Sequence, residues 1–404
     1  MSHRLNRAYL TLFLAIVSFT TALHGAEKEK ILQVLKKRVI SQPKLGHHFI
    51  KSYAQRDVSY IYDQALAIMA FTHAKNKKQA KNLLITIENL YKQHGPLHFA
   101  YMTEGSSAFA GDETRIIHGA MAWIVMSANY YQKQFKDKQF TPFAHKVLTY
   151  LETQKVSALD GEAIRFAQKD LSTTSWDETQ VLALEHNIDA YSAFKIYAEL
   201  NHNPRFEKTS QNIRKFIHGL WDNQKKHFWS GYLIDKKKIN KDEIYLDNQT
   251  WTLLAIDDSD ITYEDANSAL DKACESFYHV AIENKSEIHG FFDRRSVRAP
   301  AFDKFVWSEG TAGKLLAAKF LNPHQQYKCQ DKSEAYFRRS FEQMKKKDGG
   351  ISYATKTANI DFTTDSSVAG TAWAYFYYVG LNPFKLTVLK KFTAKPNLKM
   401  AKAK

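Results

Sequence analysis

Glycine, proline and cysteine are scarce in this sequence, which has only 16 Gly, 8 Pro and 2 Cys among 404 residues. Few glycines and prolines argue against a fold built from many tight β-turns. Two cysteines are too few for a disulfide scaffold, and their spacing fits no zinc site. The chain also lacks a Walker loop, a dinucleotide-binding glycine fingerprint, a His-Glu-x-x-His motif and a Gly-x-Ser-x-Gly motif. These absences disfavour a nucleotide-dependent enzyme and a serine hydrolase, and we expect no cofactor and no metal.

The N-terminus has the pattern of an export signal. Arg4 and Arg7 precede an almost wholly apolar run from Ala8 to Leu23, and small residues follow as far as Ala26. This order is typical of a secretory signal peptide. The run is shorter than the roughly 20 residues that a membrane-spanning helix needs. We therefore expect residues 1–26 to direct export to the periplasm or the medium, with an uncleaved anchor as the alternative.

The positive charge of the chain is concentrated near its end. The formal net charge is +15, and residues 385–404 contain seven lysines and no acidic residue. When that tail, Arg4 and Arg7 are all left out, the remaining folded body has a net charge of about +6. A charge run of this kind indicates a solvated, mobile tail that can touch an acidic envelope surface. No nucleic-acid-binding motif accompanies it, so nucleic acid is not expected as a partner.

Six segments share one local pattern, in which polar residues precede small residues and Trp, Tyr or Leu at helical spacing. The steps between equivalent positions are 56, 68, 60, 62 and 60 residues. Such steps are too long for common solenoid units and fit a helical hairpin followed by a long functional loop. The equivalent positions are Ala67, Trp123, Tyr191, Trp251, Gly313 and Trp373.

More highly charged stretches lie between these segments and carry apolar residues at every third or fourth position. This is the pattern of an amphipathic helix with one solvated face. A ring of buried inner helices surrounded by amphipathic outer helices predicts an all-α fold, an (α/α)6 barrel over residues 27–384, with short β inserts in the rim loops. The predicted outer helices are Lys77 to Gln93, Phe140 to Gln154, Phe206 to Trp221, Tyr263 to Val280 and Tyr327 to Lys347.

Two features of this arrangement stay open. An open array of hairpins is the alternative to a closed ring, although open arrays usually have shorter and more uniform repeats. Cys274 and Cys329 lie in predicted outer helices of neighbouring hairpins. In an exported protein they can form a disulfide or remain reduced.

In a closed ring all inner helices begin at one rim, so residues far apart in the sequence meet there. Helix N-termini carry partial positive charge and unsatisfied N–H groups, which favours carboxylates. Carboxylates interleaved with aromatic rings suit a sugar, because rings stack on pyranoses and carboxylates bind hydroxyls or move protons. The candidate site residues are Asp63, Glu113, Glu185, Asp189, Asp247, Glu309, Tyr62, His118, His186, Asn187, Asn248, Trp251 and Trp307.

Glu185 and Glu309 are the leading catalytic candidates. Glycoside hydrolysis needs one carboxylic acid to protonate the leaving oxygen and a second carboxylate to activate water or to attack. Asp at a helix start is often a cap, whereas Glu is a poor cap. Asp63, Asp189 and Asp247 are therefore alternates or hydroxyl ligands. Glu185 and Asp189 share one helix face and repel each other unless one is protonated or a ligand or cation lies between them.

Some of these residues have structural roles as alternatives. His186 fits a buried, hydrogen-bonded ring as well as a ligand. Trp251 belongs to the tryptophans at equivalent repeat positions, which fit inner-ring packing better than substrate stacking. Trp229 and Trp307 lie in a loop or at a helix start and are better candidates for a platform under a sugar.

Five of the six segments resemble those of bacterial proteins in the six-hairpin glycosidase superfamily. The resemblance extends from about Tyr60 to Phe384 and implies an (α/α)6 barrel with catalytic residues at its mouth. Members act on sugars as hydrolases, often inverting, or as phosphorylases, epimerases and lyases. No acid–base pair of one subfamily can be carried over to this chain. The segments are Ile61 to Ala67, Leu184 to Tyr191, Leu246 to Trp251, Val306 to Ala312 and Ser367 to Trp373.

The sequence thus predicts an exported enzyme that acts on an oligo- or polysaccharide, with hydrolysis by two carboxylates as the first hypothesis. A polysaccharide lyase or a sugar epimerase on an acidic sugar is the second hypothesis. In it Tyr62, His118 or His186 would transfer protons. A non-catalytic glycan-binding or scaffold protein is the third, because the fold does not fix the function.

Overall fold

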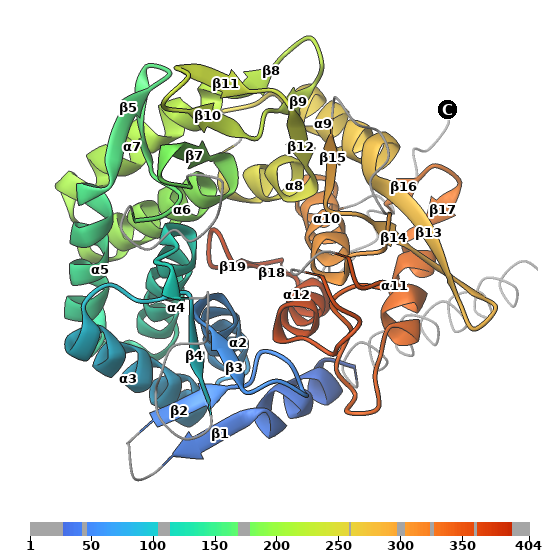
Figure 1. Cartoon of the computed structure of the whole chain (residues 1–404), viewed down its shortest axis with the longest axis horizontal. Coiled ribbons are helices and arrows are strands. Elements are labelled where there is room, and N and C mark those ends of the chain that lie inside the picture. Colours follow the sequence, from blue (N-terminus) through green and yellow to red (C-terminus); the bar gives the residue numbers. More distant parts are fainter. Residues whose placement is uncertain are drawn as a thin grey trace, which may run out of the picture.

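The computed structural model describes residues 27–42, 47–103, 114–168, 178–257, 260–296, 304–323, 327–358 and 362–389. Its helices form two concentric rings (Figure 1). The inner helices are α2 (Ile61–His73), α4 (His118–Phe135), α6 (Leu184–Asn201), α8 (Leu246–Ala255), α10 (Ser308–Leu321) and α12 (Val368–Val379). The outer helices are α3 (Lys77–His94), α5 (Thr141–Thr153), α7 (Pro204–Gly219), α9 (Tyr263–Phe277) and α11 (Glu334–Gln343).

The ring is closed. Each inner helix contacts the next one along the chain, and the last, α12, contacts the first, α2. Residues 27–37 form a further helix on the outside. It is tied to the segment after α11 by the Lys345–Glu27 ion pair of 2.5 Å, and Arg38 follows it with an ion pair of 2.6 Å to Asp348. The predicted (α/α)6 barrel is confirmed, and the open array is excluded.

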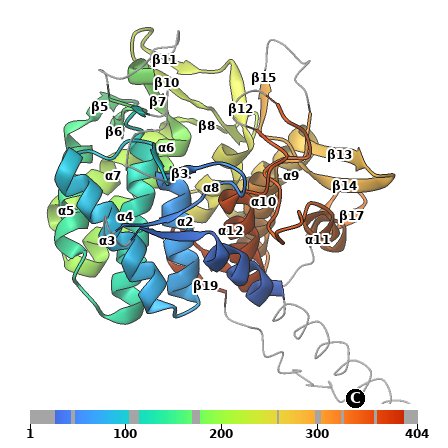
Figure 2. The same ribbon diagram turned by 60° about the horizontal axis from the view of Figure 1, so that its bottom comes forward.

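Short antiparallel strands connect the helices, as the β inserts of the prediction require. Figure 2 shows β7, β10, β12 and β15 at one end of the ring and β19 toward the other. Before α8 the strands are β1 (Val39–Gln42), β2 (His47–Ile50), β3 (Val58–Tyr60), β4 (Ala100–Met102), β5 (Lys155–Ala158), β6 (Gly161–Ile164), β7 (Val181–Ala183), β8 (Trp221–Asp222), β9 (His227–Phe228), β10 (Gly231–Leu233), β11 (Lys238–Asn240) and β12 (Glu243–Tyr245). After it they are β13 (Tyr278–Glu283), β14 (Ser286–Phe291), β15 (Arg294–Ser296), β16 (Lys328–Cys329), β17 (Lys332–Ser333), β18 (Leu381–Asn382) and β19 (Thr387–Val388).

The helix starts correct two of the equivalent positions inferred from the sequence. Counted from the first residue of each inner helix, Trp123, Trp251, Gly313 and Trp373 are all sixth residues. The matching residues of α2 and α6 are Leu66 and Asp189, not Ala67 and Tyr191. A buried aspartate therefore occupies in α6 the place that tryptophan occupies in three other inner helices.

The fourth residue of most inner helices anchors the helix to the strand or loop that precedes it. Asn187 accepts a bond from Ile164 N at 2.7 Å and donates to Ile164 O at 3.1 Å. Gln249 makes the same pair of bonds with Phe228, at 2.8 and 2.9 Å. Because buried backbone groups need partners, these amide bonds fix the position of each inner helix relative to the strand that precedes it. The corresponding residues of the other helices with such a bond are Gln64, Thr311 and Thr371.

The end of the folded chain closes the centre of the ring. Phe384, between β18 and β19, lies 5.2 Å from Trp123 and 5.6 Å from Trp251, measured between ring centroids. Trp251 stacks on Trp373 at 5.1 Å. Lys385 Nζ donates to Ile256 O at 2.5 Å. Leu386 is buried as well, so the chain still packs against the ring just past the predicted boundary at residue 384.

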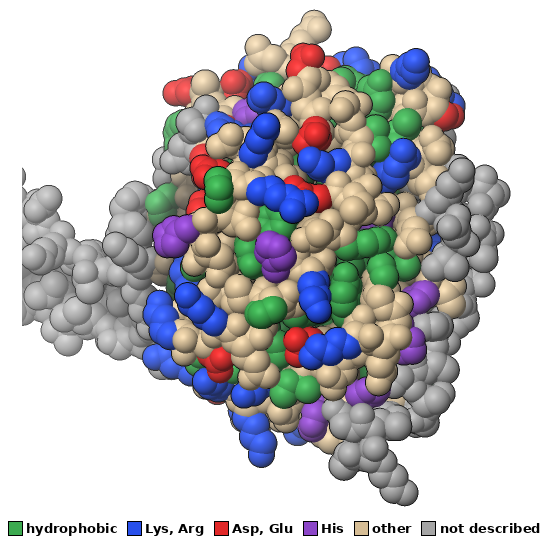
Figure 3. All heavy atoms as spheres, turned by 90° about the vertical axis from the view of Figure 1, so that its left-hand side faces the viewer, with side chains coloured by type: hydrophobic (Ala, Val, Ile, Leu, Met, Phe, Trp, Pro, Cys, Tyr) green, Lys and Arg blue, Asp and Glu red, His purple; other side chains and the backbone are tan. Residues whose placement is uncertain are grey.

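The outer helices turn one charged face to solvent. Figure 3 shows Lys and Arg side chains spread over the face that includes α5, with Asp and Glu side chains between them. The predicted outer helix from Tyr327 to Lys347 is too long at both ends, since α11 begins at Glu334 after the β16–β17 hairpin. Within the described ranges, none of the helices combines the length and the apolar character that crossing a bilayer requires.

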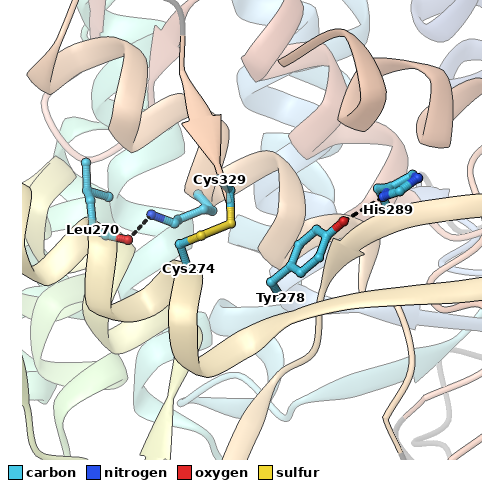
Figure 4. Close-up of a disulfide and its surroundings, with 6 residues drawn as sticks. Leu270, Cys274, Tyr278, His289 and Cys329 are labelled. Atoms are coloured by element: carbon cyan, nitrogen blue, oxygen red, sulfur yellow. Dashed lines mark hydrogen bonds between the residues drawn. A yellow bond between two sulfur atoms is a disulfide. The ribbon is translucent and has the colours of Figure 1, made fainter. Parts of the chain in front are cut away.

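A disulfide links Cys274 of α9 to Cys329 of β16, 55 residues away (Figure 4). Both half-cystines are buried, and Leu270, one helical turn before Cys274, accepts a bond from Lys314 Nζ at 2.5 Å. The bond therefore ties two neighbouring hairpins of the ring together, and Cys329 lies in a strand instead of the predicted helix.

We expect the Cys274→Ala/Cys329→Ala double variant to lose about 2–4 kcal/mol of unfolding free energy, because the open chain regains the entropy of a long loop. Urea unfolding with and without reductant measures this loss. Reductant should lower the stability of the natural chain and leave the double variant unchanged. Equal stability of natural chain and variant would contradict the expectation.

Candidate active site

Four polar side chains occupy the second position of an inner helix. They are Tyr62 of α2, Glu185 of α6, Asp247 of α8 and Glu309 of α10. The second residues of α4 and α12 are Gly119 and Ala369, so these two helices place no large side chain at the second position. The N-caps of α2, α6, α8 and α10 are extended residues without a side-chain capping bond. The acidic residues of these first turns are therefore not N-caps and are left for another role.

Glu309 is the centre of a short hydrogen-bond relay. The Tyr62 hydroxyl donates to Glu309 Oε1, and Trp373 Nε1 donates to the Tyr62 oxygen at 2.7 Å. The other carboxyl oxygen, Glu309 Oε2, is buried without a hydrogen-bond partner among the described residues. Burial raises the pKa of Glu309 to about 8, although the hydrogen bond from the Tyr62 hydroxyl has the opposite effect and lowers it. Glu309 is therefore held in one orientation and is protonated at neutral pH.

Glu185 of α6 lies close enough to Glu309 of α10 for their charges to interact. Burial raises the pKa of Glu185 to about 7, and the negative charge of Glu309 adds to this rise. Glu185 is nevertheless partly exposed, whereas Glu309 is only 1% exposed. A carboxyl that titrates near neutrality and remains reachable is suited to exchange a proton with a bound molecule.

Asp189 and Asp247 complete the acidic cluster. Burial raises the pKa of both carboxyls well above the ordinary value, and the charge of Glu185 raises each further. Asp189 lies one helical turn below Glu185, as expected, and Asp189 Oδ1 has no hydrogen-bond partner among the described residues. Because like charges at close range repel, ionisation of one of these carboxyls makes ionisation of the others less favourable.

Asp63, the third residue of α2, lies beside the cluster. Burial raises its pKa to about 7, while a hydrogen bond from Ser52 and the charge of Arg38 lower it. Its charge in turn raises the pKa of Glu309. Each of the five predicted catalytic carboxylates thus interacts electrostatically with at least one of the others, although they span nearly 250 residues of sequence.

The two predicted histidines have structural surroundings. His118 Nδ1 bonds to Arg165 O at 2.6 Å and Nε2 lies 3.3 Å from the Tyr150 hydroxyl, so both nitrogens are engaged away from the cluster. His186 packs on Phe166 at 4.1 Å between ring centroids. Burial lowers the pKa of His118 to about 4 and that of His186 to about 3. Both rings are neutral at physiological pH, and His118 is an anchor of α4.

The other predicted ligands have the following surroundings. The side-chain amide of Asn187 is hydrogen-bonded to the backbone of β6, and Trp251 is buried in the stack with Trp373. Asn248 is 2% exposed, and Trp307 is 5% exposed and packs against Phe362. Glu113 lies outside the described residues.

The structure adds residues that the sequence analysis did not single out. Tyr353 is buried next to Glu309, whose charge contributes to the strongly raised pKa of this tyrosine. Asp293 follows β14, and its charge raises the pKa of Asp247. Burial raises the pKa of Asp293 itself to about 6. Asp293 could have been found from the sequence, because it is an acidic residue directly after the apolar run from Gly290 to Phe292. No such sequence pattern points to Tyr353.

No group of three or more His, Cys, Asp or Glu in the described ranges is arranged to hold a metal ion. The acidic cluster instead consists of carboxyls whose negative charges act on one another and on the Tyr62 and Tyr353 hydroxyls.

The pH dependence of stability tests the protonation of Glu309. The folded chain binds this proton up to about pH 8, whereas the unfolded chain releases it near pH 4.5. The contribution is fully present below pH 4.5 and is lost as the pH rises to about 8, at most about 1.4 kcal/mol per pH unit. We expect the natural chain to lose stability relative to Glu309→Gln between pH 5 and 8. Parallel unfolding profiles of the two proteins would contradict this.

Comparisons of sequence give no relatives: no family model matches the chain, and no curated protein matches it. Comparisons of structure do. A D-mannose isomerase aligns with a TM-score of 0.63 and 13% identity over 89% of this chain and 97% of its own. A sugar epimerase from a ruminal bacterium aligns with a TM-score of 0.63 and 11% identity, over 88% of this chain and 98% of its own.

A third similar structure is an α-1,6-mannanase of Salegentibacter in complex with α-1,6-mannotriose. It aligns with a TM-score of 0.55 and 10% identity, over 90% of this chain and 99% of its own. This chain and these structures share one fold, so the predicted resemblance is confirmed at the level of the fold. Identities this low establish the fold alone, and the activity has to be argued from the site.

Proposed function

We propose that this chain is an exported glycan-active enzyme that hydrolyses a glycosidic bond with two carboxyls at the start of the inner helices. The observation that carries the proposal is the shared helical position of Tyr62, Glu185, Asp247 and Glu309. Four separate hairpins bring acidic or phenolic groups to one level of the ring, and two hairpins leave that level free. Structures with this barrel include a mannanase in complex with an oligosaccharide, which supports a saccharide substrate.

Glu309 is proposed as the general acid. A glycosidase acid must hold its proton at working pH and release it to the leaving oxygen, so a raised pKa is required. The pKa of Glu309, raised by burial to about 8, meets that requirement. The Tyr62 hydroxyl fixes Oε1 of this carboxyl, and the other oxygen, which Tyr353 neighbours, would deliver the proton to the leaving group.

Glu185 is proposed as the partner carboxylate. Its pKa is raised to about 7 by burial and by Glu309, so part of it is ionised at neutral pH. It is also the more exposed of the two and can reach a water molecule or the sugar. Asp247 and Asp63, whose pKa values are also raised by burial, are proposed as hydroxyl ligands.

A sugar epimerase or isomerase is the second candidate. Two observations favour it: the isomerase and epimerase structures align well, and His186 Nδ1 is buried without a partner among the described residues. A Cβ on Gly119 would lie 2.5 Å from His186 Cδ2 and 2.9 Å from Asp189 Oδ2, so this ring and this carboxyl are close together. The engaged nitrogens of His118 remove one of the three predicted proton carriers, which were Tyr62, His118 and His186.

The location and the wider partners remain proposals from the sequence. The export signal of residues 1–26 and most of the basic tail lie outside the described residues. We propose that the signal directs the protein out of the cytoplasm, where a lysine-rich tail can contact an acidic envelope.

A glycan panel tests the proposal. The mature chain is incubated with neutral, acidic and amino-sugar oligosaccharides, and products are followed by mass. Cleavage with uptake of one water supports the hydrolase. Incorporation of solvent deuterium into an intact sugar supports the epimerase, and an unsaturated product that absorbs ultraviolet light supports a lyase. Binding without any of these changes would make the protein a non-catalytic glycan-binding protein.

A further inference from the structure

A basic cavity lies on the outside of the ring next to the rim. It has a volume of about 620 Å³ and lies where Figure 1 shows β9, β12, β15 and α9 grouped together. Its charged lining consists of four cations, Lys225, Lys226, Lys272 and Arg295, against two acids, Asp271 and Glu275. The cavity is therefore suited to an anion and contains none of the carboxyls of the proposed active site.

Two of the four cations already have partners. Lys226 pairs with Asp265 at 2.6 Å, and Lys272 pairs with Glu275 at 2.9 Å. Lys225 and Arg295 have no carboxylate partner among the described residues, and both are exposed. Two positive charges thus remain for a ligand.

Trp229 holds the basic side chains in place. The Lys225 ammonium lies 4.6 Å from the centroid of the Trp229 ring, and the Lys241 ammonium lies 5.2 Å from it. Asp222 accepts bonds from the backbone of Gln224 and Lys225 and from the Trp229 side chain. Trp229 is only 3% exposed, so it positions cations by cation–π attraction instead of serving as the exposed sugar platform suggested by the sequence.

His227 supplies a second, independent sign of a ligand. It lines the cavity, is 6% exposed, and its Nε2 has no hydrogen-bond partner among the described residues. A buried nitrogen without a partner is costly unless a bound molecule or water completes it. Burial lowers the pKa of His227 to about 4, so the ring is neutral and can exchange a hydrogen bond with a hydroxyl.

One two-stranded ribbon separates this cavity from the rim. In the β12–β15 pair, Ile244 lies opposite Arg295 and Tyr245 lies opposite Arg294. Successive side chains of a strand point to opposite faces, so one pair faces the cavity and the other faces away from it. Tyr245 directly precedes α8, and Asp293 next to Arg294 acts on Asp247. The ribbon therefore presents one arginine to each side.

We infer that this cavity is a subsite for an anionic sugar unit, carrying a carboxylate or a sulfate, of the same glycan chain that enters the rim. The inference rests on the proposed function in that it places a saccharide at the rim. Lys225 and Arg295 bind the anion, and His227 binds a hydroxyl of the same unit. Arg294, opposite Tyr245 in the same ribbon, pairs with Asp293 at 3.6 Å. The protein thus selects acidic polysaccharides over neutral ones.

Binding measurements test this site separately from turnover. Calorimetric titration of the mature chain with hexagalacturonate, with a sulfated chondroitin hexasaccharide and with mannohexaose gives three dissociation constants. We expect at least one acidic probe to bind about tenfold more tightly than mannohexaose at low ionic strength, and high salt should weaken that preference. The acidic probe that binds identifies carboxylate or sulfate as the preferred anion.

The Lys225→Gln/Arg295→Gln variant should remove this preference, with an increase of about tenfold in the dissociation constant of the acidic probe. Lys37→Gln/Lys146→Gln is the control, because it removes two exposed lysines far from the cavity. Equal losses in both variants, or no preference for an acidic probe, would overturn the inference. If binding follows the expectation while no glycan is cleaved, the subsite stands and the hydrolase proposal fails.

Discussion

Glu309→Gln should abolish turnover of any glycan that the chain cleaves, with a loss of about 10³- to 10⁴-fold in kcat and little change in KM. General acid catalysis contributes about 10²- to 10⁴-fold, and the buried site leaves no solvent to replace the missing proton. Gln keeps the shape of Glu and can still accept the Tyr62 hydroxyl, so the ring should fold normally. Initial rates on the substrate found in the glycan panel measure the effect.

Glu264→Gln is the control for this prediction, because Glu264 is an exposed residue of the outer helix α9. It should keep nearly full activity. Glu185→Gln should also lose activity by more than about 10²-fold, since the partner carboxylate contributes to the same step. Full activity of Glu309→Gln would remove Glu309 from the chemistry and would move the role of acid to Asp247 or Asp189.

Phe384→Ala should destabilise the protein by about 3–5 kcal/mol, the usual cost of truncating a buried phenylalanine. Phe384 is 2% exposed and touches the three tryptophans that fill the ring. Chemical unfolding followed by tryptophan fluorescence measures the loss. The same variant should lower activity, because Trp373 both packs in this floor and donates to Tyr62.

Val388→Ala is the matched control in the same segment. Val388 is 44% exposed, and its truncation should change stability by less than about 0.5 kcal/mol. If Phe384→Ala were as mild as this control, the segment after α12 would not close the ring in solution. The interpretation of Phe384 as the floor of the barrel would then be wrong.

Part of the site could be predicted because helix starts are visible in the sequence. Glu185, Asp247 and Glu309 each precede an apolar helical pattern, which locates them in a first turn. Since all inner helices of a closed ring start at one rim, the convergence of these residues follows from the fold. The separation of buried and amphipathic helices followed in the same way from the density of charge.

The roles of neighbouring polar residues could not be predicted. Glu185, His186 and Asn187 are consecutive, yet the first joins the acidic cluster, the second packs on Phe166 and the third clamps β6. A helix turns about 100° per residue, so the rotation of α6 about its axis decides which of the three faces the ring. That rotation is set by contacts with β6 and with α4.

The sequence by itself determined the number and order of the hairpins, the starts of the inner helices and the acidic residues there, because helical periodicity and charge are local properties. Only the tertiary structure decided that Tyr62 and Trp373 hold Glu309, and that Phe384 closes the ring. It also decided that the two-stranded ribbon of β12 and β15, which carries Arg295, separates a basic cavity from the rim. These relations join residues that are distant along the chain, and their distances depend on how the two rings pack together.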